Sequence, residues 1–228
     1  MTLRSPLVMD SGCRGSDSRR CTTCPMASRS SNTQKHENRN PVQRWLISRF
    51  HRQLVRLAES VEPSSIIEVG CGEGYVLDVL ASSVMGTTLM GIDLSGPAVA
   101  AARERLADRA KIEQRDARDM ADVGTEFDLV VMVEVLEHIP QPETMLPLLS
   151  ELSSGYVLLS VPWEPWFRGL NLLRGRHIRD LGNDPEHVNH WSRAGFLDFI
   201  AETFDVVDQG SVFPWTMVLA SPRAPAAG

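Results

Sequence analysis

Three glycines at alternate positions follow a short apolar run in the first half of the chain. The run Ile66–Val69 is rich in β-branched residues, and Gly70, Gly72 and Gly74 come directly after it. A strand, a glycine turn and a helix bring backbone amides close to a ligand and direct a helix N-terminus at it. The spacing differs from the Gly-x-Gly-x-x-Gly of dinucleotide-binding turns, because Tyr75 stands at the last position. The stretch therefore predicts a ligand-binding turn, but not an NAD site.

Three acidic residues stand at the carboxyl ends of three consecutive expected strands. Glu68 precedes the glycines, Asp93 follows the second strand and Asp116 follows the third. Asp93 lies about 20 residues beyond the turn, where an acid can accept both hydroxyls of a ribose. Asp116 can accept from an adenine amine, and Ala117 can donate its backbone N–H. One such acid alone would be read as a helix cap, but three in strand order predict a nucleoside site.

These motifs resemble those of the class I S-adenosylmethionine-dependent methyltransferases, in the branch similar to ubiquinone-pathway O-methyltransferases. Glu68–Gly74 resembles the family's first motif, which accommodates the methionine part of the cofactor, and Phe127–Val131 resembles its fourth-strand motif. The resemblance covers residues 41–220 and implies that S-adenosylmethionine is the cofactor. The cofactor-binding residues that it implies are Glu68, Gly70, Cys71, Gly72, Gly74, Tyr75, Asp93, Leu94, Asp116, Ala117 and Val133.

A cluster of ionisable residues follows the fourth expected strand. Glu134, Glu137 and His138 stand at positions i, i+3 and i+4, which share one face if the segment is helical. Carboxylates with an imidazole suit a divalent cation such as Mg²⁺. Similar Glu-x-x-Glu-His clusters hold a divalent ion in some relatives, and the alternative is a hydrogen-bonded structural loop. His138 is also a candidate catalytic base.

The segment 162–191 breaks the regular alternation and is the expected acceptor side. His187 and His190 are further candidate bases, and the alternative is that His190 and Trp191 cap the helix beginning at Ser192. Apolar walls with a few polar groups suit a small ligand, and arginines suit a phosphate or carboxylate. The candidate acceptor-binding residues are Trp163, Trp166, Arg174, Arg176, His177 and Trp191.

Strand and helix patterns alternate along most of the chain. A helix with Asn40 as its N-cap is expected to end before Pro63. Strands are expected over 66–69, 87–92, 111–114, 127–133 and 156–161, with helices over 75–81, 98–106 and 144–152. A helix over 192–203 then precedes an antiparallel pair over 204–208 and 212–219, joined by 209–211. This predicts an α/β fold with a doubly wound, mostly parallel seven-stranded sheet, an N-terminal helix and a substrate-cap insertion.

Composition divides the 228 residues into a basic start and an acidic body. The whole chain carries a net charge of −6, whereas residues 1–39 hold seven Arg or Lys and three Asp or Glu, a balance of +4. The rest therefore carries −10, which argues against a broad nucleic-acid surface. We expect a disordered leader over 1–38, a methyltransferase domain over 39–220 and a flexible tail over 221–228.

The sequence also bounds location and partners. No apolar run reaches the roughly 18 residues of a membrane span, and no secretory signal is found, so a cytoplasmic protein is expected. Cys13, Cys21 and Cys24 could bind zinc, but reduced thiols in the leader are the expected state. A monomer or homodimer is expected.

Methylation of a small-molecule acceptor, at oxygen and in a biosynthetic pathway, is the predicted function. One alternative is a methyltransferase that acts on an RNA end or a protein. Another, of a different class, is a regulatory protein that binds S-adenosylmethionine without turnover.

Overall fold

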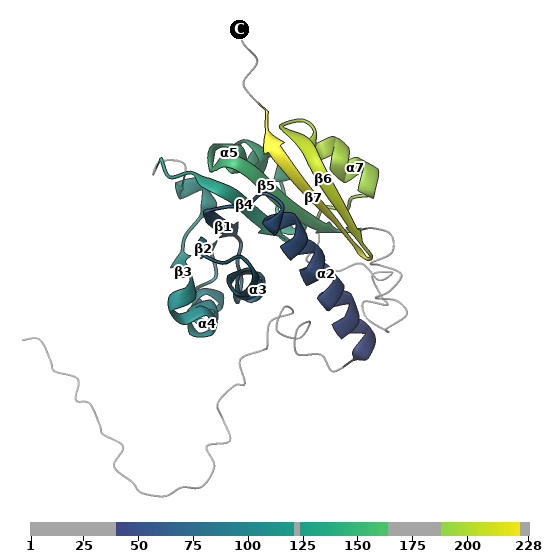
Figure 1. Ribbon diagram of the computed structural model, residues 1–228. Coiled ribbons are helices and arrows are strands. Elements are labelled where there is room, and N and C mark those ends of the chain that lie inside the picture. The colour runs from purple at the N-terminus through teal and green to yellow at the C-terminus, as the bar shows by residue number, and fades with distance from the viewer. Residues whose placement is uncertain (1–39, 121–123, 164–187, 224–228) are drawn as a thin grey trace, which may run out of the picture.

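The structure, a computed structural model, describes residues 40–120, 124–163 and 188–223. The predicted leader, most of the predicted insertion and most of the predicted tail lie outside these ranges. A seven-stranded sheet with helices on both faces forms the molecule (Figure 1). Its strands are β1 (Ser65–Val69), β2 (Thr88–Asp93), β3 (Lys111–Gln114), β4 (Phe127–Val133), β5 (Ser153–Pro162), β6 (Phe204–Val212) and β7 (Trp215–Pro222).

The strand order is β3-β2-β1-β4-β5-β7-β6. Strands β1 to β5 run parallel to one another, while β7 is antiparallel to both β5 and β6. The order reverses between β1 and β4, so the carboxyl ends of these strands border a crevice that suits ligands. The prediction of a doubly wound, mostly parallel sheet is confirmed.

Two layers of helices bury the two faces of the sheet. Successive strand residues point to opposite faces, so Ile66 packs in one core cluster and Ile67 in the other. The first cluster is covered by α2 (Pro41–Glu59), α3 (Tyr75–Ser83) and α4 (Gly96–Leu106), and the second by α5 (Met145–Glu151) and α7 (Arg193–Ile200). None of the helices in the described ranges is long and apolar enough to cross a membrane.

Helix α2 begins as the sequence predicts. The Asn40 side chain accepts a hydrogen bond from the Val42 N–H at 2.9 Å, and Pro41 stands at the first helical position. Leu54 and Leu57 are fully buried against the domain. The N-terminal helix is therefore an integral part of the core.

The predicted connection at the C-terminal hairpin is wrong. Residues 209–211 belong to β6, and the chain turns at Phe213 and Pro214 instead. A Cβ atom on Gly210 would lie 2.5 Å from the Gln53 side chain. The glycine is thus required by the close approach of α2 to the strand, and not by a turn.

Both ends of the undescribed segment 164–187 lie beside the carboxyl end of β5. Trp163 and Trp191 form an isolated parallel bridge, and the Trp163 N–H donates to the Pro214 carbonyl at 2.8 Å. The segment predicted to carry acceptor-binding residues therefore leaves and rejoins the described structure at the ligand edge of the sheet.

Replacing Leu54 by Ala should lower the free energy of unfolding by about 3 kcal/mol, because the change removes a fully buried side chain and leaves a cavity. Val42→Ala on the same helix serves as the control, since Val42 is 59% exposed and should change stability little. Chemical denaturation measures both. Equal stability of Leu54→Ala and wild type would show that α2 is not part of the cooperative core.

Candidate functional site

The glycine turn after β1 adopts a backbone that other residues rarely take. Gly70, Gly72 and Gly74 have φ angles of +76°, +52° and +77°. A Cβ atom on Gly70 would lie 2.6 Å from a methyl group of Val135, so the chain after β4 lies directly against the turn. The N–H groups of Gly70 and Cys71 donate to the Ile92 carbonyl at 2.8 and 3.0 Å. These bonds tie the turn to the end of β2.

Asp93, the last residue of β2, links the turn to the next helix. Its Oδ2 accepts from the Gly72 N–H and its Oδ1 from the Ser95 N–H, both at 2.8 Å. Each carboxylate oxygen keeps a further lone pair with which it can accept from a hydroxyl. Leu94 beside it is 66% exposed, so a large apolar side chain stands open next to the carboxylate. This pairing fits a ribose at Asp93 and a base against Leu94.

Asp116 lies two residues beyond β3 and is already engaged by its neighbour. The Arg118 N–H donates to Asp116 Oδ1 at 2.9 Å, and Arg118 Nη2 contacts Oδ2 at 2.6 Å. The Arg118 guanidinium lowers the pKa of the Asp116 carboxyl. Arg118 is 75% exposed and Ala117 is buried, so the pair sits at the rim of the site. An adenine amine that binds this carboxylate would share it with Arg118. The sequence did not reveal this ion pair.

Glu68 is buried beneath the turn, with only 2% of its surface exposed. Burial raises the pKa of its carboxyl well above the ordinary value; the Leu77 N–H opposes this shift and the nearby charge of Asp93 adds to it. Its Oε2 has no hydrogen-bond partner within the described part of the chain. A buried, unsatisfied oxygen directly under the turn suits a site that a ligand or an ordered water completes.

Cys71 in the first motif and Tyr75 directly after it have local roles in the structure. Burial raises the pKa of the Cys71 thiol, and the charges of Glu68 and Asp93 act in the same direction, so Cys71 stays protonated and is not a nucleophile. The Tyr75 ring lies 3.7 Å from the Arg105 guanidinium on α4. Contacts of Cys71 and Tyr75 with a cofactor stay predictions.

Glu134 stands directly after Val133, which is buried at the end of β4. Its φ angle of +56° is unusual for a residue with a side chain. Trp215 Nε1 donates to Glu134 Oε2 at 2.8 Å, and the Ser160 hydroxyl lies 3.4 Å from Oε1. The Trp215 ring in turn packs on Phe50 of α2, with 5.0 Å between the ring centroids. Three elements distant in sequence thus fix the direction of this carboxylate at the ligand edge.

The predicted helical arrangement of Glu134, Glu137 and His138 is wrong. Only Leu136–His138 forms a short 3₁₀ helix, and Glu134 precedes it in a left-handed backbone conformation. Glu137 is buried while His138 is exposed, so the side chains do not share one face. Among the residues that the structure describes, no three His, Cys, Asp or Glu side chains are grouped to hold a metal ion. These three side chains are therefore not arranged as the ligands of one cation in this structure.

The candidate histidines His138 and His190 lie on two segments that are hydrogen-bonded to each other. The N–H groups of Val188 and Asn189 donate to the Glu137 carbonyl at 2.9 and 3.1 Å. Both histidines are exposed, and His190 borders a pocket of about 460 Å³. Ser192, and not His190, caps α7, because its hydroxyl accepts from the Gly195 N–H. His187, Trp166, Arg174, Arg176 and His177 lie outside the described residues.

The two tryptophans predicted at the acceptor side are half-buried and packed. Trp163 meets the Phe213 ring edge-on, with centroids 6.3 Å apart. Trp191 packs on Phe196 and Phe199 of α7 at 5.7 and 5.5 Å. These contacts give both residues a structural role, and their contact with an acceptor stays a prediction.

Comparison with known proteins places the chain in a family. The family model of the methyltransferase domain matches residues 42–203. A ubiquinone biosynthesis O-methyltransferase of Methylococcus capsulatus is 27% identical over 171 residues, which are 67% of this chain and 70% of that protein. Its namesake from Pseudomonas syringae pv. tomato is 33% identical over 160 residues, covering 61% and 68%.

Solved structures give the same assignment of the fold. Magnesium protoporphyrin IX methyltransferase of Synechocystis PCC 6803, crystallised with S-adenosylhomocysteine (SAH), superposes with a TM-score of 0.61 at 21% identity. The match covers 82% of this chain and 89% of that one. With the glycine turn, the acids at the strand ends and the match over 42–203, the chain belongs to the methyltransferase domain family, and the prediction of a class I S-adenosylmethionine-dependent methyltransferase is confirmed.

Proposed function

We propose that the chain methylates an oxygen atom of a small-molecule acceptor in a biosynthetic pathway. The observation that carries this proposal is the Glu134 carboxylate, held at the carboxyl end of β4 by Trp215 and Ser160 beside the glycine turn. A fixed carboxylate at this edge suits an acceptor hydroxyl, which needs a hydrogen-bond acceptor to orient it. The relatives named ubiquinone biosynthesis O-methyltransferases support oxygen as the acceptor atom.

The residues present fit S-adenosylmethionine, which when bound supplies an activated methyl group. In the proposed arrangement the glycine turn and the N-terminus of α3 accommodate the methionine part. Asp93 accepts from the ribose hydroxyls, and Leu94 covers one face of the adenine. Asp116 and Ala117 bind the adenine edge. Glu68 lies beneath the turn and supports it.

The acceptor side needs alignment and proton removal. Methyl transfer requires no covalent intermediate with the enzyme, and the buried Cys71 thiol is not suited to form one. An oxygen acceptor loses its proton as the methyl group arrives, and a base contributes roughly 10²–10⁴-fold to such a step. His138, His187 and His190 are the proposed bases, and Glu134 orients the hydroxyl. Trp163, Trp166, Arg174, Arg176, His177 and Trp191 are the proposed acceptor-binding residues.

An acceptor screen with methyl-labelled cofactor tests the proposal. Phenols, catechols, hydroxy acids and sugars are incubated with the full chain, beside separate reactions that contain total RNA and total protein. We expect label on a small molecule at oxygen. Label on RNA or protein alone would overturn the small-molecule acceptor. Binding of S-adenosylhomocysteine without labelling in any reaction would favour a regulatory protein.

Asp93→Ala should weaken binding of S-adenosylhomocysteine by about 100-fold or more, because hydrogen bonds to a charged group are each worth about 1.5–3 kcal/mol. Calorimetry measures the affinity, and the melting temperature without ligand shows whether the turn stays folded. Asp108→Ala, an exposed acid on the 3₁₀ helix after α4, is the matched control and should bind as wild type does. An unchanged affinity of Asp93→Ala would refute its ribose role.

Trp215→Phe should lower kcat about tenfold, because it removes the donor that orients Glu134 and keeps an aromatic ring against Phe50. Glu134→Gln should lower kcat at least as much, and both variants should retain cofactor affinity. Trp45→Phe is the control, since Trp45 is 53% exposed on α2. Steady-state kinetics with the acceptor found in the screen measure kcat for each variant. A wild-type kcat in Glu134→Gln would show that this carboxylate does not orient the acceptor.

A further inference from the structure

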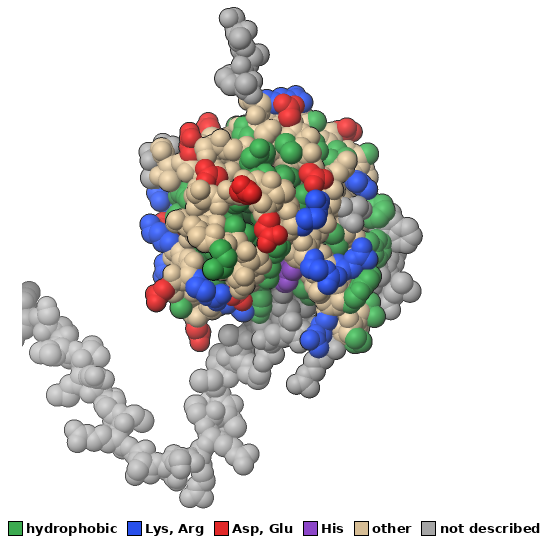
Figure 2. Space-filling model, viewed as in Figure 1, with side chains coloured by type: hydrophobic (Ala, Val, Ile, Leu, Met, Phe, Trp, Pro, Cys, Tyr) green, Lys and Arg blue, Asp and Glu red, His purple; other side chains and the backbone are tan. Residues whose placement is uncertain are grey.

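Helix α2 exposes a row of arginines on a chain that is acidic overall. Arg44, Arg49, Arg52 and Arg56 all face solvent, and the only acid of the helix is Glu59 at its last position. Figure 2 shows basic side chains gathered over the part of the surface where Figure 1 places α2. Arg49 and Arg52 stand three residues apart and Arg52 and Arg56 four, and like charges at such spacings lower helix stability. The row therefore needs compensation from elsewhere.

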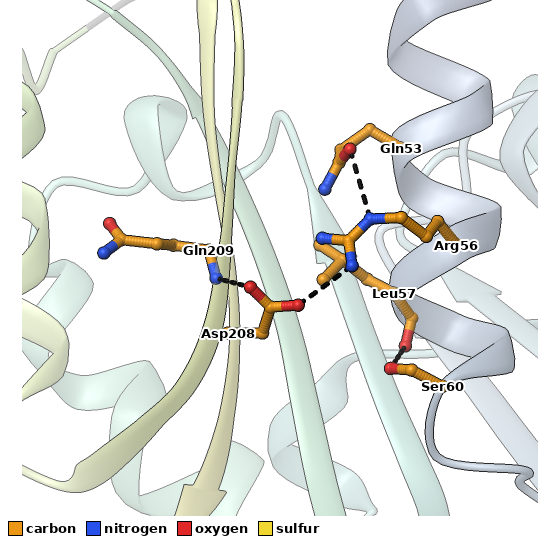
Figure 3. Close-up of polar contacts among 6 residues, drawn as sticks. All are labelled: Gln53, Arg56, Leu57, Ser60, Asp208 and Gln209. Atoms are coloured by element: carbon orange, nitrogen blue, oxygen red, sulfur yellow. Dashed lines mark hydrogen bonds and ion pairs between the residues drawn. The ribbon is translucent and has the colours of Figure 1, made fainter.

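Only part of that compensation comes from the domain itself. Arg56 forms an ion pair with Asp208 of β6 at 3.0 Å, as Figure 3 shows. Arg44 and Arg52 form no ion pair with any residue in the described ranges, and Arg52 donates only a 3.3 Å hydrogen bond to the Ser48 hydroxyl. Within the described part of the chain, Arg44, Arg49 and Arg52 thus have no ion-pair partner, and Arg49 packs over the Trp45 ring instead.

Arg44 and Arg52 line a groove of about 640 Å³ between α2 and α3. Arg56, His51 and the hydroxyl groups of Ser48 and Ser83 also line it, over an apolar floor that includes Val55 and Val79. Glu59 is the one acid among the lining residues. Burial lowers the pKa of His51, so near neutral pH its imidazole adds no charge to the groove. The groove is a concave surface with an excess of positive charge.

The groove lies apart from the cofactor-binding edge of the sheet. It borders Val79 and Ser83, in the second half of α3, whereas the glycine turn ends at Gly74, before the helix begins. At 1.5 Å per residue, Ser83 is about 13 Å along the helix from Gly74. A ligand in the groove would therefore occupy a second site, and its binding does not depend on methyl transfer.

We propose that this groove binds the phosphate monoester group of a small molecule or of a lipid headgroup. The Arg44 and Arg52 guanidinium groups in the groove match the charge of a phosphate dianion, and planar guanidinium N–H groups bind phosphate oxygens in pairs. The volume falls within the range of small-ligand sites. A nucleic acid strand would need a longer basic track than the arginines that line this groove provide.

Calorimetric titration of the full chain at low salt tests the site, with glycerol 3-phosphate as the soluble probe. Sedimentation with phosphatidylcholine vesicles, with and without phosphatidic acid, tests the lipid source. We expect the wild type to bind at least one of the two probes. Arg44→Gln and Arg52→Gln should each weaken that binding about tenfold, as for loss of a charge-assisted hydrogen bond. Glu59→Gln should strengthen it.

Arg49→Gln is the matched control, because it removes the same charge from the same helix at a residue that does not line the groove. Arg49 instead lies 4.8 Å over the Trp45 ring, and its loss should leave probe affinity within about twofold of wild type. Equal weakening in Arg49→Gln and Arg52→Gln would show a general attraction to the basic surface and overturn the site. Absence of binding to both probes by the wild type would also overturn it.

Discussion

The hydrogen bond from the Gly72 N–H to Asp93 joins the two halves of the proposed cofactor site. It connects a turn that follows β1 to the last residue of β2, and Ser95 fixes the other carboxylate oxygen at the start of α4. A parallel sheet makes this possible, because the carboxyl ends of neighbouring strands meet at one edge. If Asp93 did not accept from the Gly72 and Ser95 N–H groups, the described contacts from β2 that hold the turn in its positive-φ conformation would be the bonds to the Ile92 carbonyl alone.

A second connection runs across the sheet from the N-terminal helix to the end of β4. Phe50 packs on Trp215, whose indole N–H holds Glu134. Trp215 is the first residue of β7. Because β7 runs antiparallel to its neighbours, its first residue pairs with Pro162 at the carboxyl end of β5, where a parallel strand would have its last residue. The antiparallel hairpin thus extends the sheet and also supplies a donor to the ligand edge. Helix α2 therefore packs against the residue that holds Glu134 and also contributes to the core.

Most of the fold could be predicted from local sequence, but the contacts among distant residues could not. The strands beside Glu68 and Asp93 are apolar runs ended by glycines and caps, and these signals lie within a few residues of one another. Gly210 was misread as part of a turn, because the residue that requires a glycine there is Gln53, more than 150 residues earlier in the chain. Glu134 was misread for a similar reason. Its spacing to His138 fits a helix, whereas its N–H donates to the Ser160 carbonyl and its carboxylate accepts from Trp215.

Glu68 shows how the site is built at some expense of stability. The folded state raises the pKa of this carboxyl above its ordinary value of 4.5, so folding favours the protonated form. Its contribution to stability is fully present below the unfolded pKa and is lost as pH rises through the folded pKa. A hydrophobic residue would avoid this loss, but it would leave the Leu77 N–H without its acceptor. One oxygen of this carboxyl, Oε2, is buried beneath the turn without a hydrogen-bond partner in the described part of the chain. A ligand that donates a hydrogen bond to it would offset part of the free-energy cost of burying the carboxyl. Such a ligand would couple binding to folding through this buried group.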